Sequence, residues 1–231
     1  MSTFQIGFVI FPHLTQLDFT GPLQVLHRLP DSTTHIAAKT LDPVPSDCGL
    51  GLSPTTTFDA CGPLDLICVP GGGVGVAAAM QDAETIDFVR RQAAGARYVT
   101  SVCTGAFILG AAGVLRGRRA TTHWNYTDLL PLVGATFEKA RVVRDGNVTT
   151  AAGVASGIDF ALHLMAEIAS PEWAQTIQLG IEYDPSPPFE TGHPDKAPAA
   201  LTERASGRNL KAREAFLQAL SGWTPESATN P

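Results

Sequence analysis

The sequence predicts an α/β protein: a three-layer sandwich with a mainly parallel central sheet, helices on both faces and a cysteine nucleophile elbow. Short strand-like runs alternate with helix-like runs along most of the 231 residues. The strand-like runs, such as residues 5–11, are almost continuously apolar, which is typical of strands covered on both faces. In one place a strand-like run, 98–102, passes into an apolar helix-like run, 106–112, with only three residues between them.

The N-terminal part of the chain supplies the first strands and a first candidate residue. Residues 5–11 form a strand closed by Pro12, and Pro22 marks a place where the first helix can begin. Asp18 is therefore expected in the loop beyond the carboxyl end of this strand, where open α/β sheets place their sites. An aspartate with only a loop or capping role is the alternative. The next predicted elements are a strand at 34–39, a polar hairpin at 44–52 and a buried strand at 64–69.

A glycine-rich loop, P-G-G-G-V-G, follows the strand at 64–69 and precedes a predicted helix. The dinucleotide pattern G-x-G-x-x-G and the phosphate-loop sequence Gly-Lys-Ser/Thr are both absent. We therefore expect backbone N–H groups near Gly71 and Gly72 to face an anion, in the manner of an oxyanion hole.

The elbow at Cys103, Thr104 and Gly105 projects the cysteine side chain above the end of the sheet. The thiolate is the reactive form of cysteine, and the positive end of the following helix favours it. Cys103 is therefore a candidate nucleophile with a lowered pKa. A small buried hydrophobic residue is the alternative, because free cysteines are usually buried.

The second half of the chain continues the alternation of strands and helices. Asp82 is placed to cap a helix at 82–94, and Asp145-Gly146 predicts a hairpin between 141–144 and 148–151. The other predicted elements are a strand-like A-T-T-H-W segment, a helix at 126–133, an apolar helix after the turn that contains Val154, and a helix from Pro171.

The composition changes at Asp184, where D-P-S-P-P-F-E-T-G-H-P-D-K-A-P contains too much proline for regular structure. We predict one domain over residues 1–183. Residues 184–231 are predicted to form a proline-rich arm and a C-terminal helix, near 201–220, that pack on the same domain.

Composition and charge argue against several classes of function. A net charge of −6 argues against nucleic-acid binding, and Arg116, Arg118 and Arg119 are expected to form a solvated turn. The four cysteines have no C-x-x-C pair and no metal-ligand spacing with histidine, which predicts free thiols in a reducing compartment and no metal site. The N-terminus lacks the pattern of a signal peptide or membrane span, so we expect a cytoplasmic protein that binds no membrane.

Four motifs together resemble the ThiJ/PfpI superfamily, which has the glutamine-amidotransferase-like fold. They are L-D-F-T-G-P, P-G-G-G-V-G, V-C-T-G-A-F-I-L-G-A-A-G and A-T-T-H-W, in that order, and the resemblance runs from about Gln5 to Glu182. It is strongest to members that hydrate isocyanides. The resemblance implies a homodimeric enzyme that adds water to an isocyanide, giving an N-substituted formamide through a covalent cysteine thioimidate, without a cofactor or metal.

The same resemblance implies a role for each candidate residue. Cys103 would attack the isocyanide carbon, and Asp18 would deliver a proton to that carbon and later help to activate water. Thr104 would orient Asp18 by a hydrogen bond. Because an isocyanide is apolar apart from its head, Val154 and Trp124 are candidates for an apolar wall, and a core position is the alternative for both.

Differences between this sequence and other groups of the superfamily narrow the choice of function. Thr104 stands where the proteases and chaperone-like members commonly carry histidine, no H-x-E motif follows for an amidotransferase triad, and His123 is expected to be structural. Two alternatives stay open. One is a ligand-sensing domain related to AraC-type regulators, although the chain has no room for their two helix-turn-helix units. The other is a redox or stress protein with Cys103 as an oxidisable thiolate, whose relatives usually carry glutamate in place of Asp18.

Overall fold

A computed structural model describes residues 3–221. Its centre is a seven-stranded sheet, with strands β1 (Phe4–Val9), β2 (Ser32–Ala38), β5 (Thr56–Thr57), β6 (Leu66–Val69), β7 (Tyr98–Val102), β10 (Val142–Asp145) and β11 (Val148–Ala151). The strand order is β10-β11-β7-β6-β1-β2-β5. Neighbouring strands are parallel except in the β10–β11 hairpin. The predicted mainly parallel sheet is confirmed.

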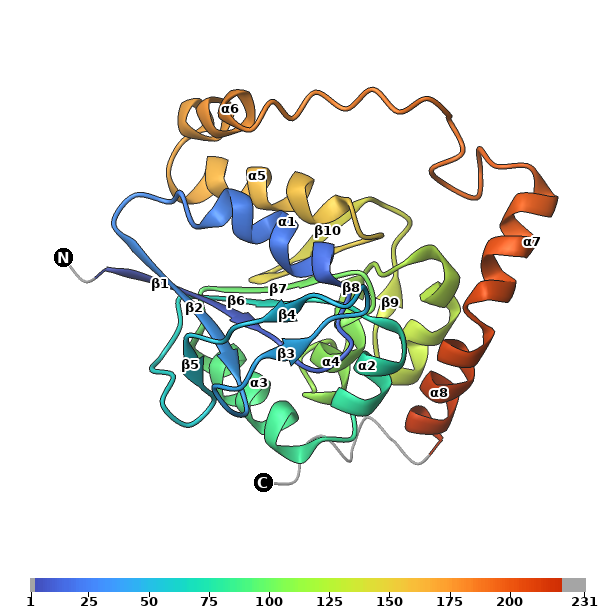
Figure 1. The fold of residues 1–231 in the computed structure, drawn as a ribbon, viewed down its shortest axis with the longest axis horizontal. Coiled ribbons are helices and arrows are strands. Elements are labelled where there is room, and N and C mark those ends of the chain that lie inside the picture. The colour runs from blue at the N-terminus through green and yellow to red at the C-terminus, as the bar shows by residue number, and fades with distance from the viewer. Residues whose placement is uncertain (1–2, 222–231) are drawn as a thin grey trace.

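Helices cover both faces of this sheet. The helices of the described residues are α1 (Gln16–Leu26), α2 (Gly73–Ala79), α3 (Ala83–Gly95), α4 (Gly105–Ala111), the 3-10 helix η1 (Trp124–Val133), α5 (Ser156–Ile168), α6 (Pro171–Gly180), α7 (Ala199–Arg208) and α8 (Leu210–Leu220). Helices α1 and α5 lie on one face, and α2, α3 and α4 lie on the other (Figure 1). The three-layer sandwich is therefore confirmed.

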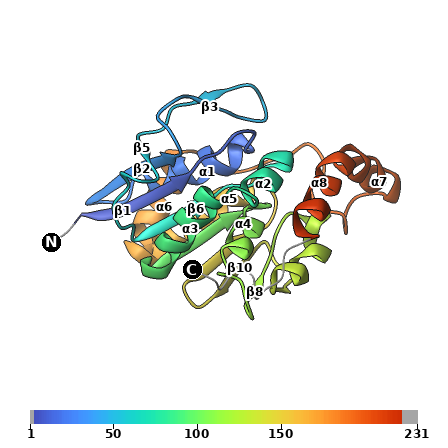
Figure 2. The ribbon, with the colours of Figure 1, turned by 90° about the horizontal axis from the view of Figure 1, so that it is seen from below.

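Two small sheets complete the secondary structure. Strands β3 (Val44–Pro45) and β4 (Gly51–Leu52) form the predicted polar hairpin, and β8 (Arg119–Ala120) pairs with β9 (Thr136–Phe137). Helices α7 and α8 lie beyond one end of the main sheet in two perpendicular views (Figures 1 and 2). The strand arrows point toward this end, so α7 and α8 flank the carboxyl edge of the parallel strands.

Local sequence signals account for several element ends. The Asp82 side chain accepts the Thr85 N–H at 3.1 Å and caps α3, and the Ser170 side chain caps α6 by accepting the Trp173 N–H at 3.1 Å. Gly146, in the β10–β11 turn, has φ of 63°, in the left-handed region that glycine enters without strain. The Asp82 cap and this hairpin are predicted from the sequence, whereas for α6 the sequence predicts only the start at Pro171.

The first helix starts earlier than predicted, at Gln16, so Asp18 lies in its first turn and not in a loop. Burial explains the difference, because Leu14 and Phe19 at this end are almost completely enclosed. Pro22 is inside the helix, where it removes one hydrogen bond, the one that its nitrogen would donate to the Asp18 carbonyl.

The A-T-T-H-W segment is less strand-like than predicted. Only Arg119 and Ala120 pair with another strand, and the next two threonines bond outside any ladder. The Thr121 N–H donates to the Thr150 hydroxyl, and the Thr122 hydroxyl donates to the Cys103 carbonyl. These competing partners end the strand and tie the segment to the elbow.

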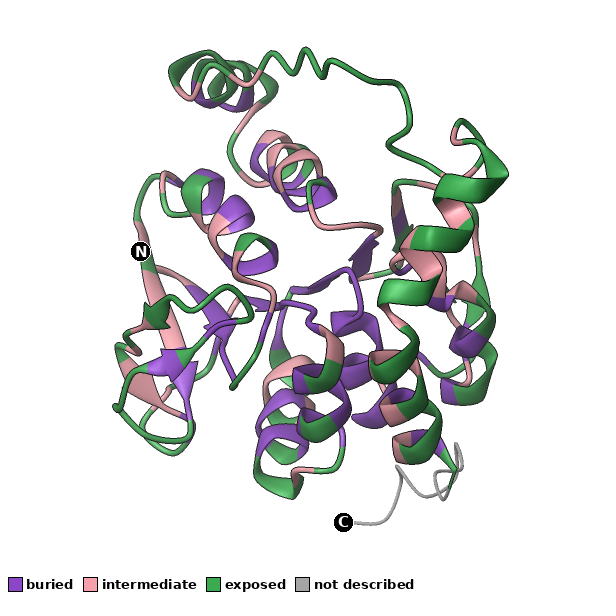
Figure 3. Cartoon of the chain, turned by 45° about the vertical axis from the view of Figure 1, so that its right-hand side comes forward, coloured by how far each residue is buried: buried purple, intermediate pink, exposed green. Residues whose placement is uncertain are grey.

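The predicted C-terminal helix is divided into α7 and α8, which meet at Asn209. Residues 222–231 of the predicted second segment lie outside the described residues. Figure 3 shows the arm and most of α7 exposed around a buried centre. Among the described residues, no helix has both the length and the apolar character needed to cross a membrane.

Candidate active site

Cys103 occupies a strained elbow between β7 and α4. Its φ is 57°, a left-handed value that is rare for residues other than glycine. The Cys103 N–H donates to the Ala151 carbonyl at 2.9 Å, and the Cys103 carbonyl accepts the Thr122 hydroxyl at 2.8 Å. A Cβ atom on Gly105 would lie 2.2 Å from the Val69 carbonyl oxygen, so only glycine lets α4 approach β6 this closely. The surrounding structure therefore holds the cysteine in a conformation that it would not choose alone.

Asp18 reaches the elbow from the first turn of α1. Its side chain is completely buried, and Oδ2 accepts the Gly71 N–H at 3.0 Å. The other oxygen, Oδ1, has no hydrogen-bond partner in the described part of the chain. A Cβ atom on Gly71 would lie 2.6 Å from Asp18 Oδ2 and 2.7 Å from the Thr104 nitrogen, so the absence of a side chain lets the carboxyl group approach the elbow.

The Asp18 carboxyl group and the Cys103 thiol interact, and both have raised pKa values. Burial raises the pKa of Asp18 to about 7, against the stabilising Gly71 N–H. Burial, followed by the negative charge of Asp18, raises the pKa of Cys103 well above its ordinary value. The lowered pKa that the elbow predicts is therefore wrong, because loss of hydration outweighs the favourable N–H of Thr104. At neutral pH the thiol keeps its proton beside a carboxyl group that is close to half ionised.

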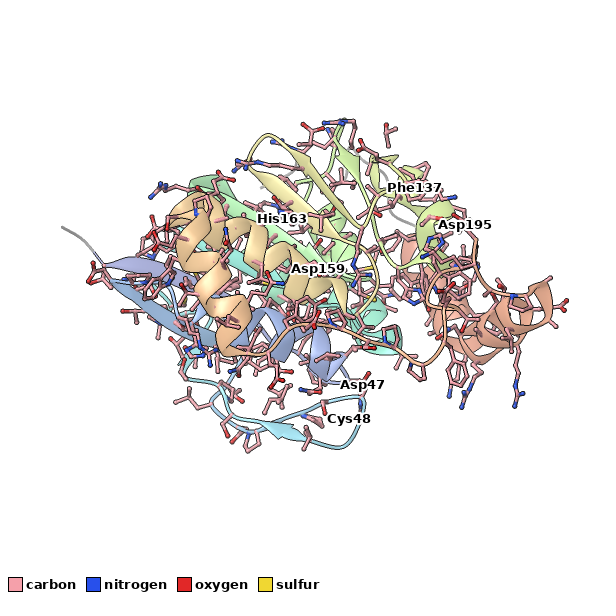
Figure 4. The ribbon with its side chains drawn as sticks, turned by 90° about the horizontal axis from the view of Figure 1, so that it is seen from above. Asp47, Cys48, Phe137, Asp159, His163 and Asp195 are labelled. Atoms are coloured by element: carbon pink, nitrogen blue, oxygen red, sulfur yellow. The ribbon has the colours of Figure 1, made fainter. Side chains whose placement is uncertain are left out.

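A second negative charge acts on Asp18 from the β3–β4 hairpin. Asp47 adds to the rise in the Asp18 pKa, and Asp47 Oδ1 accepts the Gln16 N–H at 3.2 Å. Figure 4 shows Asp47 and Cys48 on this hairpin beside the start of α1. The hairpin therefore contributes to the electrostatics of the buried pair.

Thr104 and the glycine loop are arranged differently from the prediction. The Thr104 hydroxyl accepts the Gly72 N–H at 3.0 Å and lies 3.2 Å from the Gly72 carbonyl, to which it donates. The expected bond from Thr104 to Asp18 is thus replaced by bonds to the glycine backbone. The N–H groups of Gly71 and Gly72 are bound to Asp18 and Thr104 in this conformation, so their use as oxyanion donors stays a prediction. The Thr104 N–H is the backbone donor that acts on the Cys103 sulfur.

The other sequence candidates lie around this centre. Val154 is in the turn between β11 and α5, where it is half-buried against the hydrophobic core. His123 accepts the Asn125 N–H on Nδ1 at 3.3 Å, and burial lowers its pKa to about 4, so it is neutral at pH 7. This fits the structural role expected for His123. Trp124 begins η1 and is half-buried, with its ring 5.4 Å from the His123 ring.

Sequence reasoning missed an aromatic cluster behind the elbow. Tyr126 is buried, and burial raises its pKa, with a smaller contribution from the charge that a Cys103 thiolate would carry nearby. The Phe216 ring of α8 lies 4.9 Å from that of Tyr126 and 5.1 Å from that of Phe107. Helix periodicity could have marked Phe216 as buried. No signal in the sequence indicates which distant residues it contacts.

Comparison with known proteins adds independent information. Residues 5–167 match the model of the DJ-1/PfpI family. The chain is 57% identical over 204 residues to the isonitrile hydratase of Pseudomonas putida, covering 88% of this chain and 89% of that protein.

Two solved structures are similar to the whole chain or to its main domain. A THiJ/PfpI family protein from Pseudomonas syringae has a TM-score of 0.92 and 43% identity, covering 96% of this chain and 92% of that one. The C103A mutant of a DJ-1 superfamily protein from Salmonella typhimurium has a TM-score of 0.69 and 26% identity, covering 79% of this chain and 99% of that one. The Salmonella structure thus has no counterpart for about a fifth of this chain.

Proposed function

The chain belongs to the DJ-1/PfpI family, and on that premise we propose that it is an isocyanide hydratase, a hydro-lyase that converts an isocyanide and water into an N-substituted formamide. The high identity to an isonitrile hydratase supports the activity. The observation that carries the chemistry is the buried pair of Asp18 and Cys103, which lie close enough for each to alter the other's ionisation.

The first half of the reaction joins the cysteine to the substrate. The Cys103 sulfur forms a bond to the terminal isocyanide carbon while its proton passes to the Asp18 carboxylate. Asp18 then delivers that proton to the same carbon, which leaves a neutral thioimidate, R–N=CH–S–Cys103. The raised thiol pKa suits this order, because the thiol carries the proton that the carbon needs.

The second half hydrolyses the thioimidate. Asp18, ionised again, accepts a proton from water as the water oxygen bonds to the carbon, and then passes that proton to the imidate nitrogen. The carbon–sulfur bond breaks as the new hydroxyl group gives up its proton, Asp18 transfers this second proton to the sulfur, and R–NH–CHO leaves. Water supplies the formyl oxygen, and the protonation of the enzyme is unchanged over the cycle. Thr104 supports both halves by anchoring Gly72, next to the peptide that holds Asp18.

The resemblance to the family also suggests the oligomeric state, the location and the cofactor requirement of the enzyme. We expect a homodimer in the cytoplasm that needs neither metal nor organic cofactor and binds neither membrane nor nucleic acid. Val154 is proposed to contribute to the apolar wall of the substrate site. The sensor and redox alternatives are less well supported, because the isonitrile hydratase match spans most of both proteins.

The activity is tested by incubating purified wild-type protein and Cys103→Ala with para-nitrophenyl isocyanide. Formamide formation is followed by absorbance and mass spectrometry, and thermal unfolding shows that both proteins are folded. We expect turnover in the wild type and none in Cys103→Ala. Absence of turnover by folded wild-type protein with aromatic and alkyl isocyanides would overturn the proposal.

A further inference from the structure

A cavity of about 210 Å³ lies between Trp124 and the C-terminal extension, by which we mean the arm from Asp184 together with α7 and α8. We propose that this cavity binds the organic substituent of the isocyanide, and that the extension thereby selects substrates with one aromatic ring or an apolar group of similar size. The inference rests on the proposed function and deepens it.

The lining of the cavity fits an apolar group. Trp124 supplies an aromatic wall, and the extension adds Pro194 and Ala197 from the arm and Leu201 and Ala205 from α7. The lining also contains three polar side chains, Thr191, His193 and Thr202, but none of the lysines, arginines or carboxylates among residues 3–221. A cavity of about 150 Å³ with apolar walls is large enough to hold benzene. The cavity therefore has room for a ring with a small substituent, which would contact Trp124 and the apolar side chains of the lining.

The cavity lies close in the chain to a residue that is hydrogen-bonded to the elbow. Trp124 is two residues from Thr122, whose hydroxyl donates to the Cys103 carbonyl at 2.8 Å. Two residues of extended chain span at most about 7 Å. His123 lies between Thr122 and Trp124 in the sequence, and its ring is tilted by 34° relative to the Trp124 ring. The same ring lies beside Gly153, in the turn that follows β11. Through Trp124 the cavity therefore lies next to the segment that supports the nucleophile.

The extension is held in place by contacts with the same region. Arg213 of α8 donates to the Asn125 carbonyl at 2.7 Å and pairs with Asp128. On the arm, Asp195 pairs with Lys139 at 2.5 Å, at the side of the domain where Figure 4 also shows Phe137. Helix α7 itself contains no buried residue, so it contributes little to the core. Its inner side instead encloses the cavity.

The distribution of the extension among relatives agrees with this role. Residues 1–183 are 79% of the 231 residues (183/231), which equals the share that the Salmonella structure covers. The match to the isonitrile hydratase covers 88% of this chain, so it must include residues beyond a segment of that length. The isonitrile hydratase match therefore reaches into the extension, whereas the share of this chain that the Salmonella structure covers is no larger than residues 1–183.

The test fills the cavity in the full-length protein. Ala205→Phe places a ring in it from α7, and Ala200→Phe puts the same ring at an exposed position of α7 outside the lining. KM and kcat are measured with para-nitrophenyl isocyanide and with methyl isocyanide. For Ala205→Phe we expect a tenfold or greater rise in KM for the aromatic substrate and less than a twofold change in kcat/KM for methyl isocyanide. Ala200→Phe should leave both unchanged.

The outcomes separate this inference from the proposed function. If Ala205→Phe matches Ala200→Phe with the aromatic substrate, the cavity is not the subsite, although the hydratase activity stands. If wild-type protein hydrates neither substrate, the proposed function itself fails. A second variant, Leu201→Ala, removes apolar contact without filling space, and we expect it to raise the aromatic KM about threefold. A change in kcat alone would contradict a binding role.

Discussion

Helix α4 begins at the carboxyl edge of the sheet and α7 lies beyond that edge, yet the two helices are held in different ways. Every residue of α4 is buried, whereas no residue of α7 is. Burial of apolar surface is the main stabilising contribution to a fold, so α4 and the elbow that precedes it are set by the core. The extension depends on a few anchoring side chains of α8. The difference teaches that the elbow is a structural necessity of the domain, while the extension is an addition whose value lies in what it encloses.

The largest effect on activity should come from a substitution in the buried pair beside the elbow. Asp18→Asn keeps an oxygen for the Gly71 N–H but removes the proton acceptor, so we expect kcat/KM to fall by about 10²–10⁴-fold. Steady-state kinetics with para-nitrophenyl isocyanide measure this loss. Full activity in this variant would exclude Asp18 from proton transfer.

The same variant should be more stable than the wild type at alkaline pH. The pKa of Asp18 rises from 3.8 to about 7 on folding, so between these values the folded state binds a proton that the unfolded state lacks. Wild-type stability therefore falls as pH rises through this window. We expect Asp18→Asn to gain on the order of 2–4 kcal/mol at pH 8 and little at pH 4. Urea unfolding at the two pH values provides the check.

Phe216→Ala tests how the extension is anchored. The Phe216 side chain is completely buried between Tyr126 and Phe107, and its removal should cost about 3 kcal/mol in the free energy of unfolding. The neighbouring Leu217 is 44% exposed, so Leu217→Ala is the control and should cost less than about 0.5 kcal/mol. Equal losses in urea unfolding would show that α8 is not anchored through Phe216.

The pH profile of activity should report the ionisation of Asp18 and the effect of Asp47 on it. Because Asp18 must be ionised to accept the thiol proton, kcat/KM should fall about tenfold per pH unit below a midpoint near the Asp18 pKa of about 7. Asp47 raises that pKa, so Asp47→Asn should move the midpoint to lower pH. His123 stays neutral down to about pH 4 and should not contribute. A flat profile between pH 5 and 8 would contradict the assignment of Asp18.

The smallest effect is expected at the ion pair that holds α8 to η1. Arg213→Ala removes the pair with Asp128 and the bond to the Asn125 carbonyl, and solvent screening limits the loss to about 1 kcal/mol. Arg90→Ala, which removes an exposed i,i+3 pair with Asp87, is the matched control and should cost about 0.3 kcal/mol. The difference should shrink in high salt, as measured by thermal unfolding. Identical costs would mean that the Arg213 contacts do not stabilise the extension.

The sequence by itself determined the sheet, most of its helices and the identity of the central pair. Apolar runs reveal buried strands, Asp82 and Pro171 reveal helix starts, and the short step from strand to helix reveals Cys103 at a turn. All of these are local patterns, because an apolar run, a helix cap and a turn are each formed by residues that are neighbours in the chain. The motifs around Asp18 and Cys103 also sufficed to place the protein in its family.

Only the tertiary structure decided the chemical state of the site and the place of the extension. The pKa of Cys103 follows from how completely the fold removes water and from the charge of Asp18, and these outweigh the local helix effect that the sequence suggested. The N–H groups of Gly71 and Gly72 are engaged because Asp18 and Thr104 arrive from other elements. Phe216 meets Tyr126 through packing between segments far apart in the chain. Hydration, hydrogen-bond pairing and long-range packing depend on which surfaces meet, and that depends on the whole fold.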